Sequence, residues 1–254
     1  MEFNEKLKTI KIRELFVASI ITIILVMILP DIFPIIDSEE NLWFALFFFI
    51  FLLFFIWKLR DTTGFTSNIK NVFEKSNQKE ILYVFLLNFF FTLLTIIVAY
   101  SISVGDSDTV LTTITPLAII LEIIATVILG PAVEELIFRG VLLNRLKIRI
   151  GVIPAILVSS IIFGLGHESV GMVSAVIFGV CMCILYLKTD NILTTISLHM
   201  LNNFVVIILD LVNIDSLMFE YTWFTIITVI SLIATVLLVI YMYKGLKEVR
   251  YLKD

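Results

Sequence analysis

Residues 41–59 read NLWFALFFFIFLLFFIWKL, and Lys58 is the only charged residue in this run. A helix needs about 20 mostly apolar residues to cross the hydrocarbon core of a bilayer. The run therefore predicts a transmembrane helix, and it is the pattern against which the rest of the chain is compared.

Runs of this kind recur along the whole chain. Its 254 residues are 60% hydrophobic and 16% charged, with a mean hydropathy of +1.08, whereas soluble domains are about 45–50% apolar and about 25% charged. The runs predict eight helices, at 15–36, 41–59, 81–104, 110–145, 151–168, 170–188, 191–213 and 221–244. The fourth is long and contains a Gly130-Pro131 break. We expect an all-α, polytopic transmembrane bundle that forms a single membrane domain over residues 1–254.

Basic residues alternate with these helices. Of the 18 Lys and Arg residues, all but Arg139 lie before the first helix or after the second, fourth, sixth and eighth. The charged residues of the opposite segments are all acidic: Asp31, Asp37, Glu39, Glu40, Asp106, Asp108, Asp210, Asp215 and Glu220. Because Lys and Arg are enriched on the cytoplasmic side, both termini are predicted to be cytoplasmic. The protein is predicted to lie in a cell membrane, and no feature indicates nucleic-acid binding.

Residues 61–80 form the one sizeable predicted cytoplasmic loop. Phe65, Ile69, Val72 and Phe73 are spaced i, i+4, i+7 and i+8, which predicts a short amphipathic helix on the inner membrane surface. Such a helix is either a membrane-skimming connector or a gate for the substrate.

Three groups of polar residues interrupt the apolar runs. The two histidines, His167 and His199, lie in predicted helices, and residues 134–139 read EELIFR in a third. Ionisable groups at bilayer depth cost a few kcal/mol or more each, so they usually face the protein interior and serve a function. At a rise of 1.5 Å per residue, Glu134 and His199 lie at nearly the same depth, about 16 and 14 Å from the cytoplasmic charges. His167 lies up to about 24 Å deep if its helix is straight.

Helical spacing relates these residues to one another. Glu135 and Arg139 are i, i+4 and can form an ion pair on one helix face. Glu134 points about 100° away from that face and is free to face a cavity. His199 and Asn203 are also i, i+4, so an imidazole and an amide can present donors side by side.

The fifth predicted helix carries the third group. Phe163 and His167 share one of its faces, and two glycines between them allow another backbone to approach closely. Glu122, near the outer interface, and Glu168, at the start of an outer turn, are not expected to be functional.

Each group also has a purely structural interpretation. Glu135 and Arg139 can form a buried ion pair without a catalytic role. Asn203 can link two helices by a hydrogen bond, and His167 can be an interfacial residue near the outer loop.

Together the groups resemble the motifs of the CAAX prenyl protease and bacteriocin-processing (CPBP) family of intramembrane proteases, also called the Abi family. The first motif, EExxxR, matches residues 134–139, which Gly140 follows. The second, FxxxH, matches residues 163–167, and the third, HxxxN, matches residues 199–203. Order, spacing and helix placement all agree, and the resemblance covers about residues 80–215. It implies an enzyme that hydrolyses peptide bonds within the membrane.

The resemblance implies a role for each motif residue. Glu134 would be the general base, and His167 would help it to activate the attacking water. His199 and Asn203 would stabilise the oxyanion. Three further residues would support these side chains: Glu135, Arg139 and Phe163.

No cofactor is expected, although a metal is an alternative. Glu134, His167 and His199 are a ligand set similar to those of catalytic zinc sites, and members of the family are traditionally named metalloproteases. The sequence has no HExxH motif, however, and these ligands would come from three separate helices.

The expected partners are the lipid bilayer and a membrane-embedded or lipid-associated peptide or protein. A composition rich in Ile, Leu, Phe, Asn and Lys is typical of an AT-rich bacterial source, which predicts a plasma-membrane location. Bacterial members of the family imply a pheromone or bacteriocin precursor rather than a prenylated CAAX protein. The depth of Glu134 and His199 predicts cleavage in the inner half of the bilayer. The alternatives are a non-catalytic immunity or scaffold protein and a proton-coupled transporter, although no inverted repeat supports the latter.

Overall fold

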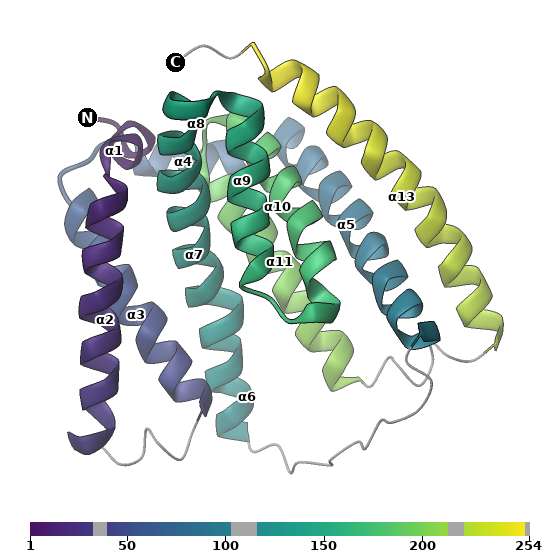
Figure 1. The fold of residues 1–254 in the computed structure, drawn as a ribbon, viewed down its shortest axis with the longest axis horizontal. Coiled ribbons are helices and arrows are strands. Elements are labelled where there is room, and N and C mark those ends of the chain that lie inside the picture. Colours follow the sequence, from purple (N-terminus) through teal and green to yellow (C-terminus); the bar gives the residue numbers. More distant parts are fainter. Residues whose placement is uncertain (33–39, 103–115, 213–220, 252–254) are drawn as a thin grey trace.

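The computed structural model describes residues 1–32, 40–102, 116–212 and 221–251. These residues form helices and no strand, and the first described helix begins at the end of the bundle where the last described helix finishes (Figure 1). Outside the motif-bearing segment 116–150 the helices are α1 (Phe3–Thr9), α2 (Ile12–Ile32), α3 (Glu40–Leu59), α4 (Phe65–Val72), α5 (Lys75–Ile102), α9 (Val152–Leu165), α10 (Ser169–Thr189), α11 (Ile192–Leu211) and α13 (Tyr221–Val249).

The polytopic helical bundle predicted from the sequence is confirmed. Among the described residues, six helices are long and apolar enough to cross a membrane: α2, α3, α5, α10, α11 and α13. The shorter α9 and the helical segment 116–150 complete the eight predicted helices. The chain is thus a multi-pass membrane protein.

Segment 116–150 is helical throughout, so the predicted break at Gly130-Pro131 is wrong. Its successive stretches are α6 (Pro116–Glu122), η2 (Ile123–Leu129), α7 (Gly130–Glu135), η3 (Leu136–Leu143) and α8 (Asn144–Ile150), of which η2 and η3 are π-helical. Pro131 lies in the first turn of α7, directly after the π-helical stretch η2. The π-helical turns on either side change the hydrogen-bond register, and such turns are frequent at functional sites. Asn144 donates to the carbonyls of Arg139 and Gly140, each at 3.0 Å, and so satisfies part of the η3 backbone.

Helix α9 ends earlier than the predicted limit of residue 168. It stops at Leu165, because Gly166 takes the C-cap position and the His167 N–H bonds to the Gly164 carbonyl at 3.0 Å. Fourteen residues span about 21 Å, which is less than the 30 Å of a hydrocarbon core. The turn between α9 and α10 accordingly ends well short of the outer ends of the neighbouring helices (Figure 1). Non-helical backbone at such depth must be buried in protein or line a water-filled cavity.

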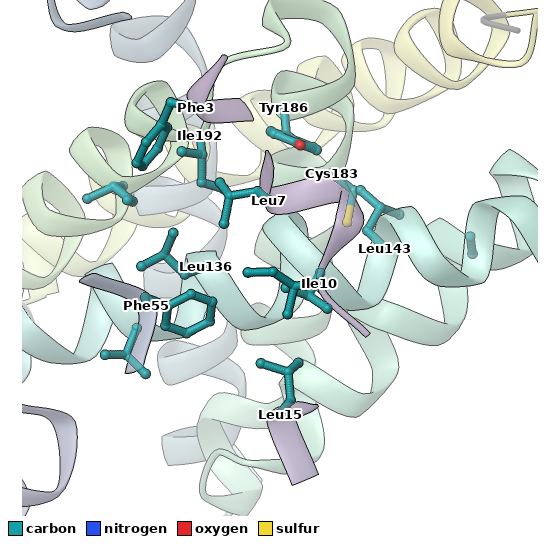
Figure 2. Packing of buried hydrophobic residues seen from close by; sticks show 14 of the residues in the cluster. Phe3, Leu7, Ile10, Leu15, Phe55, Leu136, Leu143, Cys183, Tyr186 and Ile192 are labelled. Carbon is teal, nitrogen blue, oxygen red and sulfur yellow. The ribbon is translucent and has the colours of Figure 1, made fainter. Parts of the chain in front are cut away.

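Two short helices lie at the end of the bundle that the positive charges predict to be cytoplasmic. The predicted amphipathic helix is α4, in which Val72 is buried while Phe65 and Ile69 are exposed. Helix α1 was not predicted, although Phe3 and Leu7 have helical spacing and both are buried in a core that also contains residues of α3, η3, α10 and α11 (Figure 2). Leu7 lies against Gly140, where a Cβ would be 3.4 Å from the leucine side chain. Helix α1 therefore covers the cytoplasmic side of the motif-bearing helix.

Candidate active site

The first and third motifs meet in a buried hydrogen-bonded cluster. Arg139 Nη1 donates to Glu135 Oε1 at 2.8 Å, which is the ion pair expected from their spacing. The same carboxylate oxygen lies 2.9 Å from His199 Nδ1 on α11. Because a carboxylate paired with an arginine accepts hydrogen bonds, the His199 ring carries a proton on Nδ1. These three residues, Glu135, Arg139 and His199, are called the buried cluster below.

Neighbouring helices close tightly around the buried cluster. The side chains of Glu135 and Arg139 are 0% exposed, and that of His199 is 4% exposed. Arg139 Nη2 donates to the Gly179 carbonyl of α10 at 3.3 Å. A Cβ on Gly179 would lie 3.0 Å from a side chain of α9, so the glycine allows α10 to come close. The guanidinium also lies over the Phe163 ring, 4.5 Å from its centroid, in a cation–π arrangement.

Glu134 occupies different surroundings from Glu135. Its Oε2 lies 3.8 Å from His199 Nε2, which confirms that the two residues are at one depth. This separation is longer than a hydrogen bond. The Glu134 side chain is 28% exposed, and no hydrogen bond to another described residue occupies its carboxyl. Glu134 is therefore the carboxyl of this motif that remains able to accept a proton.

His167 lies in the turn after α9 rather than within a helix. Its Nδ1 is 3.0 Å from the Phe163 carbonyl, and a carbonyl can only accept, so Nδ1 carries a proton. The ring is stacked beside Phe163, with centroids 4.8 Å apart. In both rings Nδ1 is engaged and Nε2 is left for chemistry.

A cavity of about 150 Å³ joins the second and third motifs. His167, His199 and Asn203 all line it, together with residues near the outer ends of α9 and α10. We call it the site cavity. Its walls bring the two imidazoles and the amides of Asn202 and Asn203 around a single space.

Asn203 does not pair with His199, the neighbour at i−4. Its Nδ2 donates to the Thr126 carbonyl of η2 at 2.7 Å, which links α11 to the motif-bearing helix. The structural interpretation of Asn203 thus describes a real contact. An amide nitrogen has two hydrogens, however, and one remains available at the wall of the site cavity.

Some residues of the site were not identified from the sequence. Asn202 lines the site cavity beside Asn203 and was detectable as a second amide in an apolar run. Phe178 packs edge-on against His199, with centroids 5.2 Å apart. No sequence signal separates Phe178 from the other 21 phenylalanines.

A zinc site needs at least three His, Cys, Asp or Glu side chains that converge on one point. Among the described residues, no three His, Cys, Asp or Glu side chains are close enough together to hold a metal ion. The Nδ1 contacts of His199 and His167 do not count against zinc, because a zinc-bound histidine also donates its other ring N–H to a carboxylate or a carbonyl. Among the described residues, it is the separation of the candidate ligands that does not fit the zinc alternative.

Comparison with known proteins identifies the same part of the chain. The family model described as "Type II CAAX prenyl endopeptidase Rce1-like" matches residues 116–205, which contain all three motifs. A curated protein of Bacillus subtilis (strain 168), "Putative membrane peptidase YdiL", is 37% identical over 92 residues. That similarity spans 35% of this chain and only 38% of the relative. No solved structure matches the chain.

Proposed function

We propose that this protein is an intramembrane endopeptidase, since residues 116–205, which contain all three motifs, belong to the CPBP family. It hydrolyses a peptide bond of a membrane-embedded or lipid-associated peptide by direct attack of water. The observation that carries the proposal is a free carboxyl beside His199, whose imidazole shares a cavity with that of His167. Glu134 Oε2 lies 3.8 Å from His199 Nε2, and both His199 and His167 line one cavity.

Glu134 is the general base of the proposed reaction. A water molecule beside Glu134 Oε2 transfers a proton to this carboxylate while the oxygen of the water attacks the peptide carbonyl carbon. His167, through its free Nε2, helps to orient that water. Glu134 then returns the proton to the amine that leaves, so proton transfer balances over the cycle. General acid–base catalysis of this kind contributes about 10² to 10⁴ in rate.

His199 and Asn203 stabilise the negative charge that develops on the carbonyl oxygen. His199 presents Nε2 to the site, and it donates from this atom when the ring is doubly protonated. Asn203 contributes the amide hydrogen that is not bonded to Thr126. Donors that are fixed before the reaction need no reorganisation in the transition state. Glu135 and Arg139 hold the His199 ring in this orientation from the buried side.

We propose that the reaction needs no metal, because the candidate ligands do not converge on one point. Metal analysis of the purified protein, combined with an activity assay after chelation, tests this directly. We expect substoichiometric zinc and unchanged cleavage in the presence of a chelator. Stoichiometric zinc whose removal abolishes cleavage, and whose return restores it, would contradict a metal-free mechanism.

The activity itself is tested by comparing membrane peptides from cells that contain the wild-type protein, Glu134→Ala or His199→Ala at equal levels. We expect cleavage products that occur with the wild type and are absent with both variants. Products that persist unchanged with both variants would rule out the proposed site. The same comparison identifies the substrate, which we propose to be a pheromone or bacteriocin precursor if the source is bacterial.

Two functions from other classes make different predictions for the same variants. A scaffold or immunity protein would still complement a deletion strain when Glu134 is replaced, whereas a protease would not. A proton-coupled transporter would move protons in liposomes that contain no peptide. Loss of complementation in Glu134→Ala, without such proton movement in the wild type, supports the protease over both.

A further inference from the structure

A second cavity adjoins the site cavity on its outer side. It has a volume of about 260 Å³ and lies between α5, α6 and α11. Thr92 and Asn202 line both cavities, so the two cavities lie next to each other. The walls of the second cavity are apolar over most of their length, with Phe89, Leu93 and Val206 among them. We call this second cavity the outer groove.

The outer groove contains two carboxyl groups on different helices. Glu122 lies at the end of α6 and Asp210 near the end of α11, and both line the cavity. Neither side chain forms an ion pair with another described residue. At the cytoplasmic end, by contrast, Glu14 pairs with Lys58 at 2.9 Å and Glu80 pairs with Lys188 at 2.6 Å.

The whole sequence offers these two carboxyl groups no counter-ion. Every Lys and Arg is in a cytoplasmic segment except Arg139, which pairs with Glu135. This holds for the complete chain, including the outer segments that the structure does not describe, because those segments contain no Lys or Arg. A cation at the outer groove must therefore come from outside the chain. Glu122, which was not expected to be functional, is part of this feature.

We propose that the outer groove binds the substrate on the outer side of the scissile bond, with an apolar segment along α5 and α11 and a Lys or Arg side chain between Glu122 and Asp210. This proposal rests on the proposed function and specifies its substrate class. An apolar wall removes apolar side chains from water or lipid headgroups, while carboxylates that line the same cavity favour an ammonium or guanidinium group. The groove is complementary in both respects to a basic, otherwise apolar peptide.

The length of the groove predicts where the basic residue lies in the substrate. Asp210 follows His199 by 11 residues on α11, which corresponds to about 16 Å along the helix at 1.5 Å per residue. An extended peptide covers that distance in about five residues at 3.3 Å per residue. The Lys or Arg is therefore expected about five residues from the scissile bond. The substrate then extends from the site into the outer half of the bilayer, while the scissile bond itself lies in the inner half.

Binding to the inactive variant Glu134→Ala tests the groove separately from catalysis. The variant is placed in nanodiscs of zwitterionic lipid, with a chelator present so that divalent cations do not compete. The probes are fluorescent apolar peptides that carry Lys, Gln or Glu five residues before or after their central bond. Empty nanodiscs provide the correction for partition into lipid. In at least one of the two series, we expect the Lys peptide to bind about tenfold more tightly than the Gln peptide, equivalent to about 1.4 kcal/mol, and the Glu peptide to bind most weakly.

Removing the two charges gives the decisive comparison. In Glu134→Ala with Glu122→Gln and Asp210→Asn, Lys and Gln peptides should bind equally, with the affinity for the Gln peptide retained. Asp61→Asn is the matched control, because its carboxyl is highly exposed at the cytoplasmic end and its removal should leave the Lys preference intact. Equal binding of the three peptides to the Glu134→Ala protein would overturn the proposal, as would a Lys preference that survives the double substitution.

The cleavage assay distinguishes failure of this inference from failure of the proposed function. If the Lys preference depends on Glu122 and Asp210 but the wild-type protein cleaves none of the bound peptides, the groove stands as a peptide site and the protease proposal is contradicted. If the wild type cleaves the Lys, Gln and Glu peptides at equal rates, the protease proposal stands and the groove is not the determinant of specificity.

Discussion

Glu134 and Glu135 are consecutive residues of one helix, yet the two faces on which they lie differ in almost every respect. The face of Glu135 is fully buried, and its carboxylate is bonded to both Arg139 and His199. The face of Glu134 is partly open, and the nearest basic atom, His199 Nε2, is 3.8 Å away. The difference shows how a two-glutamate motif divides its work. One carboxylate fixes the geometry, and the other remains available for proton transfer.

The largest effect on catalysis is expected from Glu134→Gln. Gln keeps the shape of the side chain but cannot accept the proton, so cleavage should fall by about 10² to 10⁴. The free energy of unfolding of the purified protein should change by no more than about 0.5 kcal/mol, as for other substitutions that break no structural contact. A large loss of stability would show that Glu134 belongs to the structural face instead.

The next largest effect is expected from Arg139→Met on the buried face. Removing one partner leaves the Glu135 carboxylate buried without its cation, which typically costs 3–5 kcal/mol. We expect a clear drop in the unfolding temperature, measured in detergent or nanodiscs. The double variant Glu135→Gln, Arg139→Met removes both charges and should recover part of that stability without recovering cleavage. If Arg139→Met unfolds at the wild-type temperature, the buried face of Glu135 does not stabilise the fold, and the proposed difference between the two faces is wrong.

Asn203→Ala should produce a smaller but still substantial loss of cleavage. Loss of one oxyanion donor typically costs about 10² to 10³ in rate, whereas loss of an interhelical hydrogen bond costs about 0.6–2 kcal/mol of stability. Asn202→Ala is the control on the neighbouring residue and should affect cleavage by less than about tenfold. If Asn203→Ala loses stability but keeps its cleavage rate, Asn203 only links α11 to η2.

The smallest effect is expected from Phe163→Leu, at the boundary between the two faces. The Phe163 ring contacts the Arg139 guanidinium at 4.5 Å and the His167 and His199 rings at 4.8 and 5.8 Å. Losing the cation–π contact should cost about 1–2 kcal/mol, with a severalfold decrease in cleavage as both imidazoles become less fixed. Phe163→Tyr retains the ring and is the matched control. A full loss of cleavage in Phe163→Leu at wild-type stability would place Phe163 in the chemistry itself.

Much of the fold follows from the sequence because a bilayer leaves few alternatives. Apolar runs of about 20 residues become helices, since no water is present to satisfy an open backbone. The i, i+4 spacing of Glu135 and Arg139 was sufficient to predict their ion pair. The helical rise placed Glu134 and His199 at nearly the same depth, but only the structure shows that the two side chains meet. These features depend on helical geometry, which the sequence reports directly.

The features that could not be predicted depend on local exceptions to that geometry. Gly130-Pro131 was expected to break the helix, but the helix continues through the proline, with one π-helical stretch before it and another after it. His167 was expected within a helix that in fact ends at Leu165. The partner of Asn203 is a backbone carbonyl, which has no sequence signature. Helix α1 was overlooked because its apolar residues are few beside those of the membrane-spanning runs.

The most direct test of the division between the two faces is cleavage in water enriched with oxygen-18. Purified wild-type protein, Glu134→Gln and Glu135→Gln are each mixed with a substrate peptide in nanodiscs, and the products are analysed by mass spectrometry. We predict one oxygen-18 atom in the new carboxyl terminus with the wild type, and labelled product that forms about 10² to 10⁴ times more slowly with Glu134→Gln, although Glu134→Gln unfolds at the wild-type temperature. Glu135→Gln should lose both stability and cleavage. Incorporation by Glu134→Gln at the wild-type rate would contradict the assignment of Glu134 as the base.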